Sequence, residues 1–163
     1  MTLDTLNASS PDAFVAALGS IIEGSPWAAA RAWRRRPFAS LEALHQAMMA
    51  EVSAASRDQQ LDVLRAHPDL ATRTPMTATS AGEQAAAGLD RLTPTEFAQL
   101  EALNTAYREK FGFPFLLAVM GSTKHDVLAA LTARLAATVQ DELAEALRQV
   151  SRIAWFRLQD VIT

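Results

Sequence analysis

His67 has the setting best suited to proton transfer among the three histidines of this 163-residue chain. It is expected at the C-terminal end of a helix, where the helix dipole favours the imidazolium, and Pro68 restricts the backbone that leaves it. A histidine held in this way can donate a proton near neutral pH. The alternative is structural, with the imidazole bonding the last carbonyl groups of the helix as a cap.

A second group of candidates is the segment Ser80-Ala81-Gly82-Glu83-Gln84. Ser80 and Glu83 have the spacing of a capping box, in which the two side chains reciprocally bond backbone N–H groups at a helix start. We therefore expect a helix to begin at Ser80, which requires no function. A helix N-terminus also presents N–H groups to electron-rich ligand atoms, and Gln84 would lie beside them. The same residues could thus face a ligand.

Arg157 lies at the edge of the apolar stripe of the last predicted helix, between Ala154 and Leu158 in angular position. In one interpretation its aliphatic stem lies along the apolar surface and its guanidinium pairs with Asp160 on the next turn. In the other, the guanidinium points inward and binds a carboxylate. The basic run Arg34-Arg35-Arg36 is typical of a solvated surface, and we assign it no site.

Composition excludes several kinds of site. Without cysteine the chain can form no disulfide, thiolate nucleophile, iron–sulfur cluster or cysteine-based zinc site. Its histidines are isolated and it has no glycine-rich nucleotide motif, so we expect no metal site. With 15 Lys plus Arg against 18 Asp plus Glu, it lacks the basic excess of nucleic-acid-binding proteins. No apolar stretch is long enough for a membrane span and no signal peptide is recognisable, so we expect a cytoplasmic location.

Helix-start patterns recur along the chain and predict about seven or eight helices. A serine or threonine in an N-cap position precedes a proline or an acidic first turn at most of them. The predicted starts are Ser10-Pro11, Ser25-Pro26, Ser40, Ser56 to Gln59, Ser80, Thr93-Pro94, Ser122 or Thr123, and Thr138. Residues 67–79 show no apolar period, and a loop of that length in a compact domain is usually functional.

One stretch cannot be assigned from periodicity. The apolar run from Phe115 to Met120, after Gly112-Phe113-Pro114, could be a strand, a buried turn or a helix. No hairpin or alternating strand pattern occurs elsewhere. We predict an all-α fold without a sheet, formed as a single compact domain over residues 1–163, because a chain of this length can bury a sufficient core.

Three motifs of the chain, in their order and spacing, resemble one protein family. They are Ala66-His67-Pro68-Asp69-Leu70-Ala71, then Ser80 to Gln84 with Ala87-Gly88-Leu89, then Leu103 to Tyr107 leading into Lys110-Phe111-Gly112-Phe113-Pro114-Phe115. Ser25-Pro26-Trp27 and the segment from Arg152 to Leu158 extend the likeness over nearly the whole chain. On these motifs the chain is similar to the 2-oxo-4-hydroxy-4-carboxy-5-ureidoimidazoline (OHCU) decarboxylases of urate breakdown.

The resemblance implies an all-α homodimer that converts OHCU to (S)-allantoin and carbon dioxide without a cofactor. It assigns His67 as the catalytic proton donor, with Glu83 and Arg157 as further catalytic residues. The substrate-binding positions that it implies are Pro68, Ser80, Ala81, Gly82, Glu83, Gln84, Phe115, Leu116, Leu117, Ala118 and Val119. In the last five, main-chain groups would bind the polar atoms of the ureido and imidazoline groups.

Two other functions remain open at the level of sequence. The chain could be a non-catalytic helical interaction module, in which the motifs serve packing and the basic run forms a partner surface. It could also be a hydrolase of another ureido or imidazolone compound, which would need a positioned water. A histidine, a glutamate and an arginine that converge from distant segments would favour an enzyme over the module.

Overall fold

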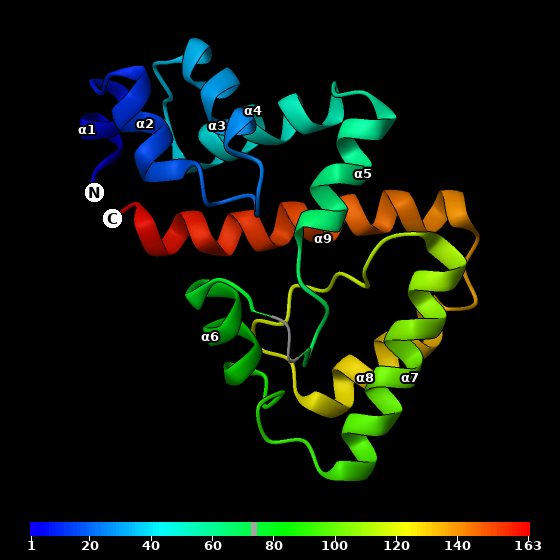
Figure 1. Cartoon of the computed structure of the whole chain (residues 1–163). Helices are drawn as coiled ribbons and strands as arrows, with labels where there is room; N and C mark the ends of the chain where they lie inside the picture. The colour runs from blue at the N-terminus through cyan, green and yellow to red at the C-terminus, as the bar shows by residue number, and fades with distance from the viewer. Residues whose placement is uncertain (73–74) are drawn as a thin grey trace. The chain divides into compact units, whose positions relative to one another are not determined.

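The computed structural model describes residues 1–72 and 75–163, and within them the chain forms helices joined by turns and loops (Figure 1). These residues contain nine α-helices, one short 3₁₀ helix and no strand. The result confirms the predicted all-α class and the predicted helices, with the five-residue α1 in addition. The α-helices are α1 (Leu3–Asn7), α2 (Pro11–Leu18), α3 (Pro26–Ala32), α4 (Leu41–Ser53), α5 (Arg57–Ala66), α6 (Ala78–Ala86), α7 (Pro94–Phe111), α8 (Lys124–Arg134) and α9 (Val139–Val161).

Most helices begin where the capping patterns predicted. The Ser56 hydroxyl accepts from the Gln59 N–H at 3.2 Å, and the Gln59 side chain accepts from the Ser56 N–H at 3.3 Å, which starts α5. Reciprocal capping boxes also start α7 at Thr93 and α8 at Thr123. Each such cap contributes about 1 kcal/mol because it satisfies N–H groups that have no partner inside the helix.

α2 ends at Leu18, although apolar residues at helical spacing continue to Ile21 and Ile22. The Gly19 N–H bonds the Val15 carbonyl at 2.7 Å. Gly19 favours termination because glycine is a poor helix former. It also allows α3 to approach, since a Cβ at this position would lie 3.2 Å from the Pro26 Cβ.

The chain divides into two compact units, and the boundary falls within α9. Unit 1 comprises Met1–Ala66 and Val150–Thr163, and unit 2 comprises His67–Gln149. The description of one domain over residues 1–163 stays a prediction.

Unit 1 is built around α3, which packs against α2 and α4. Its core contains fully buried side chains from α2 and α4, among them Phe14, Leu18 and Leu44. The two ends of the chain meet in this unit, since the Thr163 N–H donates to the Met1 carbonyl at 2.9 Å (Figure 1).

Unit 2 contains a cluster of aromatic rings formed by the end of α7 and the residues that follow it. α7 packs against α8. The Tyr107 ring lies 4.5 Å from the Phe111 ring, 6.0 Å from the Phe113 ring and 5.4 Å from the Phe115 ring, measured between centroids. α7 ends at Phe111, because Gly112 takes the left-handed conformation with φ 78°. The run after it, which periodicity could not assign, has neither helix nor strand from 114 to 119.

Within the described part of the chain, no helix combines the length and the apolar character that a membrane span requires.

Candidate functional site

His67 follows directly after Ala66, the last residue of α5, as the position of Pro68 predicted. Its side chain is buried, with 5% of its surface exposed. The end of α5 is closely packed in unit 1, because Gly24 comes so near that a Cβ on it would lie 2.8 Å from the Ala66 Cβ. Ala66, the residue before His67, therefore packs directly against the backbone of Gly24, and only glycine allows so close an approach.

The chain that follows Pro68 is held by side chains from two helices. The Ala71 N–H donates to the Gln84 side-chain oxygen of α6 at 2.7 Å, and the Asn104 amide of α7 donates to the Leu70 carbonyl at 3.0 Å. Arg108, also of α7, forms an ion pair with the Asp69 carboxylate at 2.9 Å. Because Gln84 bonds this segment, the structure brings α6 to the chain that directly follows the His67-Pro68 pair.

Ala71 itself has a backbone conformation that needs such support. Its φ is 53°, in the left-handed region, which costs a residue with a Cβ roughly 1–2 kcal/mol. The bond from its N–H to Gln84 opposes that cost directly. Gln84 is buried, and the structure thus gives it a backbone-holding role in addition to the predicted place beside a ligand.

The predicted start of α6 at Ser80 is wrong. Thr77 is the N-cap, its side chain accepts from the Ser80 N–H at 3.2 Å, and the helix begins at Ala78. Ser80 and Glu83 are therefore not a capping box, because the earlier threonine satisfies the orphan N–H of Ser80. Ser80 is buried in the first turn and Glu83 is half-buried in the second, while Ala81 and Gly82 are exposed.

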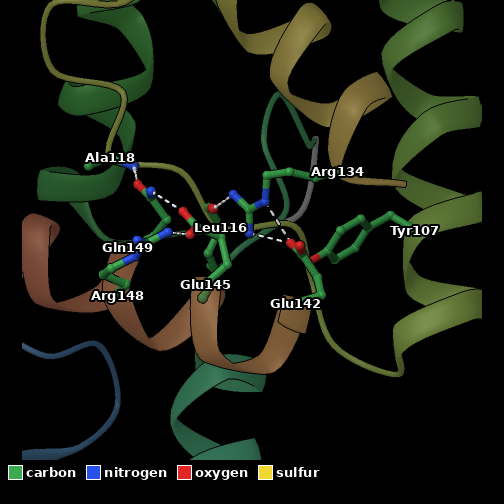
Figure 2. A network of polar contacts seen from close by, with 8 residues as sticks. All are labelled: Tyr107, Leu116, Ala118, Arg134, Glu142, Glu145, Arg148 and Gln149. Carbon is green, nitrogen blue, oxygen red and sulfur yellow. Dashed lines mark hydrogen bonds and ion pairs between the residues drawn. The ribbon is translucent and has the colours of Figure 1, made fainter. Parts of the chain in front are cut away.

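The stretch Phe115–Val119 is buried except at its centre, where Leu117 is half-buried. Two of its main-chain groups are bonded to side chains. The Leu116 carbonyl accepts from Arg134 Nη1 at 2.5 Å, and the Ala118 N–H donates to Gln149 Oε1 at 3.0 Å (Figure 2). Because these two groups already have protein partners, a ligand would have to bond other main-chain groups of the stretch.

A buried polar cluster supports that stretch. Arg134 pairs with Glu142, and the Tyr107 hydroxyl donates to the same carboxylate at 2.5 Å (Figure 2). The Glu142 side chain is 2% exposed, so its charge depends on these partners. Burial, first, and then the bond and charge of Glu142 raise the pKa of Tyr107, so the phenol stays protonated far above its usual range.

Arg157 points inward, which contradicts pairing with Asp160. Its Nη1 lies 2.9 Å from Glu23 Oε2 and 3.3 Å from the Ile21 carbonyl, and the two ionic side chains are 6% and 8% exposed. All these groups belong to unit 1, whereas the other predicted site residues belong to unit 2. The guanidinium of Arg157 thus binds a carboxylate, that of Glu23, as the inward interpretation requires.

Neither of two surface cavities in unit 2 is lined by a predicted site residue. The larger, of about 1000 Å³, lies between α7 and residues 69–72 and 75, and it is lined in part by Leu70, Asn104 and Arg108. The smaller, of about 320 Å³, lies where the end of α6 meets the start of α8. The larger cavity borders the segment that follows His67, and among the described residues no three metal-ligating side chains gather anywhere.

The chain is thus all-α, with a buried histidine followed by a loop that side chains of α6 and α7 hold in place. Comparison with known proteins identifies the family. A sequence model of the OHCU decarboxylase family matches residues 7–159, so the chain belongs to that family.

Relatives and a solved structure agree with this assignment. The chain is 44% identical to the 2-oxo-4-hydroxy-4-carboxy-5-ureidoimidazoline decarboxylase of Halalkalicoccus jeotgali, over 99% of this chain and 92% of that protein. It is 45% identical to the uric acid degradation bifunctional protein PucL of Bacillus subtilis, over 99% of this chain but 33% of that one. Its fold matches a crystal structure of (S)-allantoin synthase with a TM-score of 0.80 and 36% identity, over 99% of this chain and 54% of the other.

Sequence reasoning missed the supporting residues Glu23, Arg134, Glu142 and Gln149. Two of them carried a detectable pattern, because Glu142 and Gln149 lie on the buried face of α9 with Leu143 and Val150. Polar residues on an apolar stripe at helical spacing indicate buried hydrogen-bond partners. Nothing local marked Glu23, whose partner Arg157 is 134 positions away.

Proposed function

We propose that this chain converts OHCU to (S)-allantoin and carbon dioxide without a cofactor, with His67 as the proton donor. Membership of the OHCU decarboxylase family makes the chain a carboxy-lyase of urate degradation. The observation that carries the role of His67 is its buried position at the end of α5, followed by a loop braced from α6 and α7.

The reaction needs no metal or organic cofactor in principle. When the carboxylate leaves as carbon dioxide, the electron pair of the broken C–C bond forms a C=C bond to the ring carbon that bears the ureido group. The electrons of the adjacent C=N bond move onto the ring nitrogen, which takes up a proton. The resulting enol becomes a carbonyl when its hydroxyl loses a proton and a proton is added to the carbon that bears the ureido group. The reactant itself thus stabilises the electron pair, and the protein has to place that proton on one face.

His67 is suited to this step because the backbone around it is fixed. Ala66 is packed against Gly24 within unit 1, and within unit 2 Gln84, Asn104 and Arg108 hold the residues that follow. A positioned general acid contributes roughly 10² to 10⁴ in rate. Delivery from one side would give one enantiomer, which agrees with the name of the (S)-allantoin synthase that this fold resembles.

The remaining predicted site residues would bind the substrate. Glu83 and Gln84 would hold the hydroxyl and ureido groups, and Ser80 to Gly82 would contribute the first turn of α6. Arg157 would orient the carboxylate or stabilise negative charge as it develops. Glu23, beside Arg157, would keep that guanidinium in one orientation.

The direct experiment generates OHCU in situ from urate with uricase and hydroxyisourate hydrolase. The protein is then added, and circular dichroism follows the allantoin that forms. We expect rapid formation of optically active (S)-allantoin, with the same rate in the presence of a chelator. Racemic product at the uncatalysed rate would refute the proposal, and activity lost on chelation would refute its cofactor-free part.

Two further parts of the proposal concern the whole protein. We expect a homodimer, as the family resemblance implies, which light scattering coupled to size exclusion would test. We also expect the chain to act in the cytoplasm on its small-molecule substrate, without binding nucleic acid or membranes.

A further inference from the structure

The stretch Phe115–Val119 is held at alternate residues by side chains from α8 and α9. Arg134, the last residue of α8, donates to the Leu116 carbonyl at 2.5 Å. Gln149 of α9 accepts from the Ala118 N–H at 3.0 Å. Leu117 lies between the two bonded groups, and it is the least buried residue of the five.

The alternation determines which main-chain groups remain for a ligand. Arg134 bonds the C=O of residue 116 and Gln149 bonds the N–H of residue 118, so the groups directly on either side of Leu117 have protein partners. Among the described residues, no hydrogen bond reaches the N–H or the C=O of Leu117 itself.

Both holding side chains are themselves fixed by a second partner (Figure 2). Arg134 pairs with Glu142, and its guanidinium lies 4.5 Å from the centroid of the Phe115 ring. The Gln149 amide nitrogen donates to the Glu145 carboxylate at 2.6 Å. Since only the nitrogen of an amide can donate to a carboxylate, this bond orients the Gln149 oxygen toward the Ala118 N–H.

We propose that Arg134 and Gln149 are positioning residues that present the N–H and C=O of Leu117 to the ureido group of the substrate. A ureido group carries both N–H donors and a carbonyl acceptor, so it can bond the N–H and the C=O of one residue together. Neither side chain touches the substrate in this arrangement; each acts through the backbone. The inference rests on the proposed function, because the ligand is that of the decarboxylation.

Replacement of Gln149 by methionine tests the proposal most directly. Gln149→Met keeps the length of the side chain but removes the acceptor for the Ala118 N–H. We expect the Kd for (S)-allantoin, measured by calorimetry, and the KM for OHCU to rise by about tenfold or more, with a smaller change in kcat, because the lost contact binds the ureido group rather than the reacting bond. Hydrogen exchange of the amides in residues 115–119 should become faster.

A double variant provides the matched rescue. Glu145→Gln with Gln149→Glu exchanges the two side chains, so the amide of residue 145 can donate to the carboxylate of residue 149, which still accepts from the Ala118 N–H. We expect its Kd for (S)-allantoin to return to within about threefold of the original protein. Val127→Ala is the control for a general loss of stability, because it removes buried methyl groups from α8 without touching Arg134 or Gln149. We expect this variant to bind (S)-allantoin with an unchanged Kd.

The outcomes separate the two proposals. If the unaltered protein does not accelerate OHCU decarboxylation, the proposed function fails. If it does, while folded Gln149→Met binds (S)-allantoin as tightly as the original or the rescue binds as weakly as Gln149→Met, the positioning role is refuted. If Gln149→Met does not fold, Arg134→Lys is measured by the same criteria, since lysine lacks the planar fork of donors with which Arg134 reaches Glu142 and Leu116.

Discussion

The single residue on which the proposed chemistry depends is His67, buried one position beyond the end of α5. Two roles compete for such a residue. As a cap it would bond carbonyl groups and serve stability, and as a proton donor it would serve turnover. The two roles make different predictions for a substitution that suits a helix end.

His67→Asn should leave the protein folded and lower the rate of OHCU decarboxylation by on the order of 10² or more. Asparagine is well tolerated just beyond a helix, and it cannot donate a proton as an imidazolium does. Melting temperature and the circular dichroism assay measure the two effects. The control is His125→Asn, the same change at an exposed histidine. Unfolding of the variant would identify a structural cap, and full activity would place the donor elsewhere.

Glu83 is the second residue whose role can be decided by one substitution. Because Thr77 caps α6, Glu83 has no capping duty that Gln would have to replace. Glu83→Gln should therefore leave the melting temperature nearly unchanged. If its charge holds the substrate, catalysis should fall by about tenfold or more, and (S)-allantoin should bind more weakly. Glu109→Gln on the exposed face of α7 is the matched control, and normal turnover of Glu83→Gln would remove Glu83 from the catalytic residues.

At the scale of elements, the site depends on how closely the turn after α2 approaches the end of α5. Gly24 has φ 59°, and a Cβ on it would overlap the Ala66 Cβ at 2.8 Å. Gly88 is a comparison within the same chain, since its φ is also positive at 80°, but the nearest atom to an added Cβ is 4.0 Å away. The two glycines share the backbone strain and differ in the overlap.

Gly88→Ala should lower the free energy of unfolding by roughly 1–2 kcal/mol, the cost of a left-handed residue with a Cβ. Gly24→Ala should lower it by about 1–3 kcal/mol more, because the overlap adds to the strain. Urea denaturation measures both. Ala66→Gly in the Gly24→Ala background should recover much of the difference. Equal losses for the two alanines would show that the approach of Gly24 to Ala66 imposes no constraint.

At the scale of the whole molecule, the polar cluster around Glu142 couples stability to alkaline pH. The pKa of Tyr107 is raised from its ordinary value near 10, mainly by burial and then by Glu142. Above about pH 10 the unfolded chain loses this proton while the folded protein keeps it, so the unfolded state binds fewer protons. The free energy of unfolding must then fall as pH rises, by up to about 1.4 kcal/mol per pH unit, whereas below pH 10 the contribution is constant.

Tyr107→Phe should remove this component of the pH dependence, although it lowers stability by about 1–3 kcal/mol at neutral pH through the lost bond to a buried carboxylate. The measurement is the free energy of unfolding of both proteins as a function of pH between neutral and alkaline values. Lysine titration contributes equally to the two curves, so the difference between their slopes reports Tyr107. Tyr107 is the only tyrosine, so tyrosinate absorbance reports it alone. We expect that absorbance to appear only with unfolding; its appearance in the folded protein near pH 10 would contradict the raised pKa.

The sequence alone determined the helices, most of their starts and the position of His67. These features follow from neighbours within one turn: Ser56 with Gln59, Thr93 with Glu96, Gly112 after Phe111, and Pro68 after His67. Caps and backbone preferences act over three or four residues, so the local order of residues contains them. The same locality explains the error at Ser80, where two overlapping cap patterns competed and Thr77 took the position.

Only the tertiary structure decided the partners of the buried charges and of the Phe115–Val119 backbone. Arg157 pairs with Glu23 rather than with Asp160, and Arg134 and Gln149 bond Leu116 and Ala118. Each of these bonds joins side chains or backbone far apart in sequence, and no local spacing distinguishes the true partner from other polar groups. A buried charge or N–H must find a partner to offset its loss of water, but which partner it meets depends on how all the helices pack.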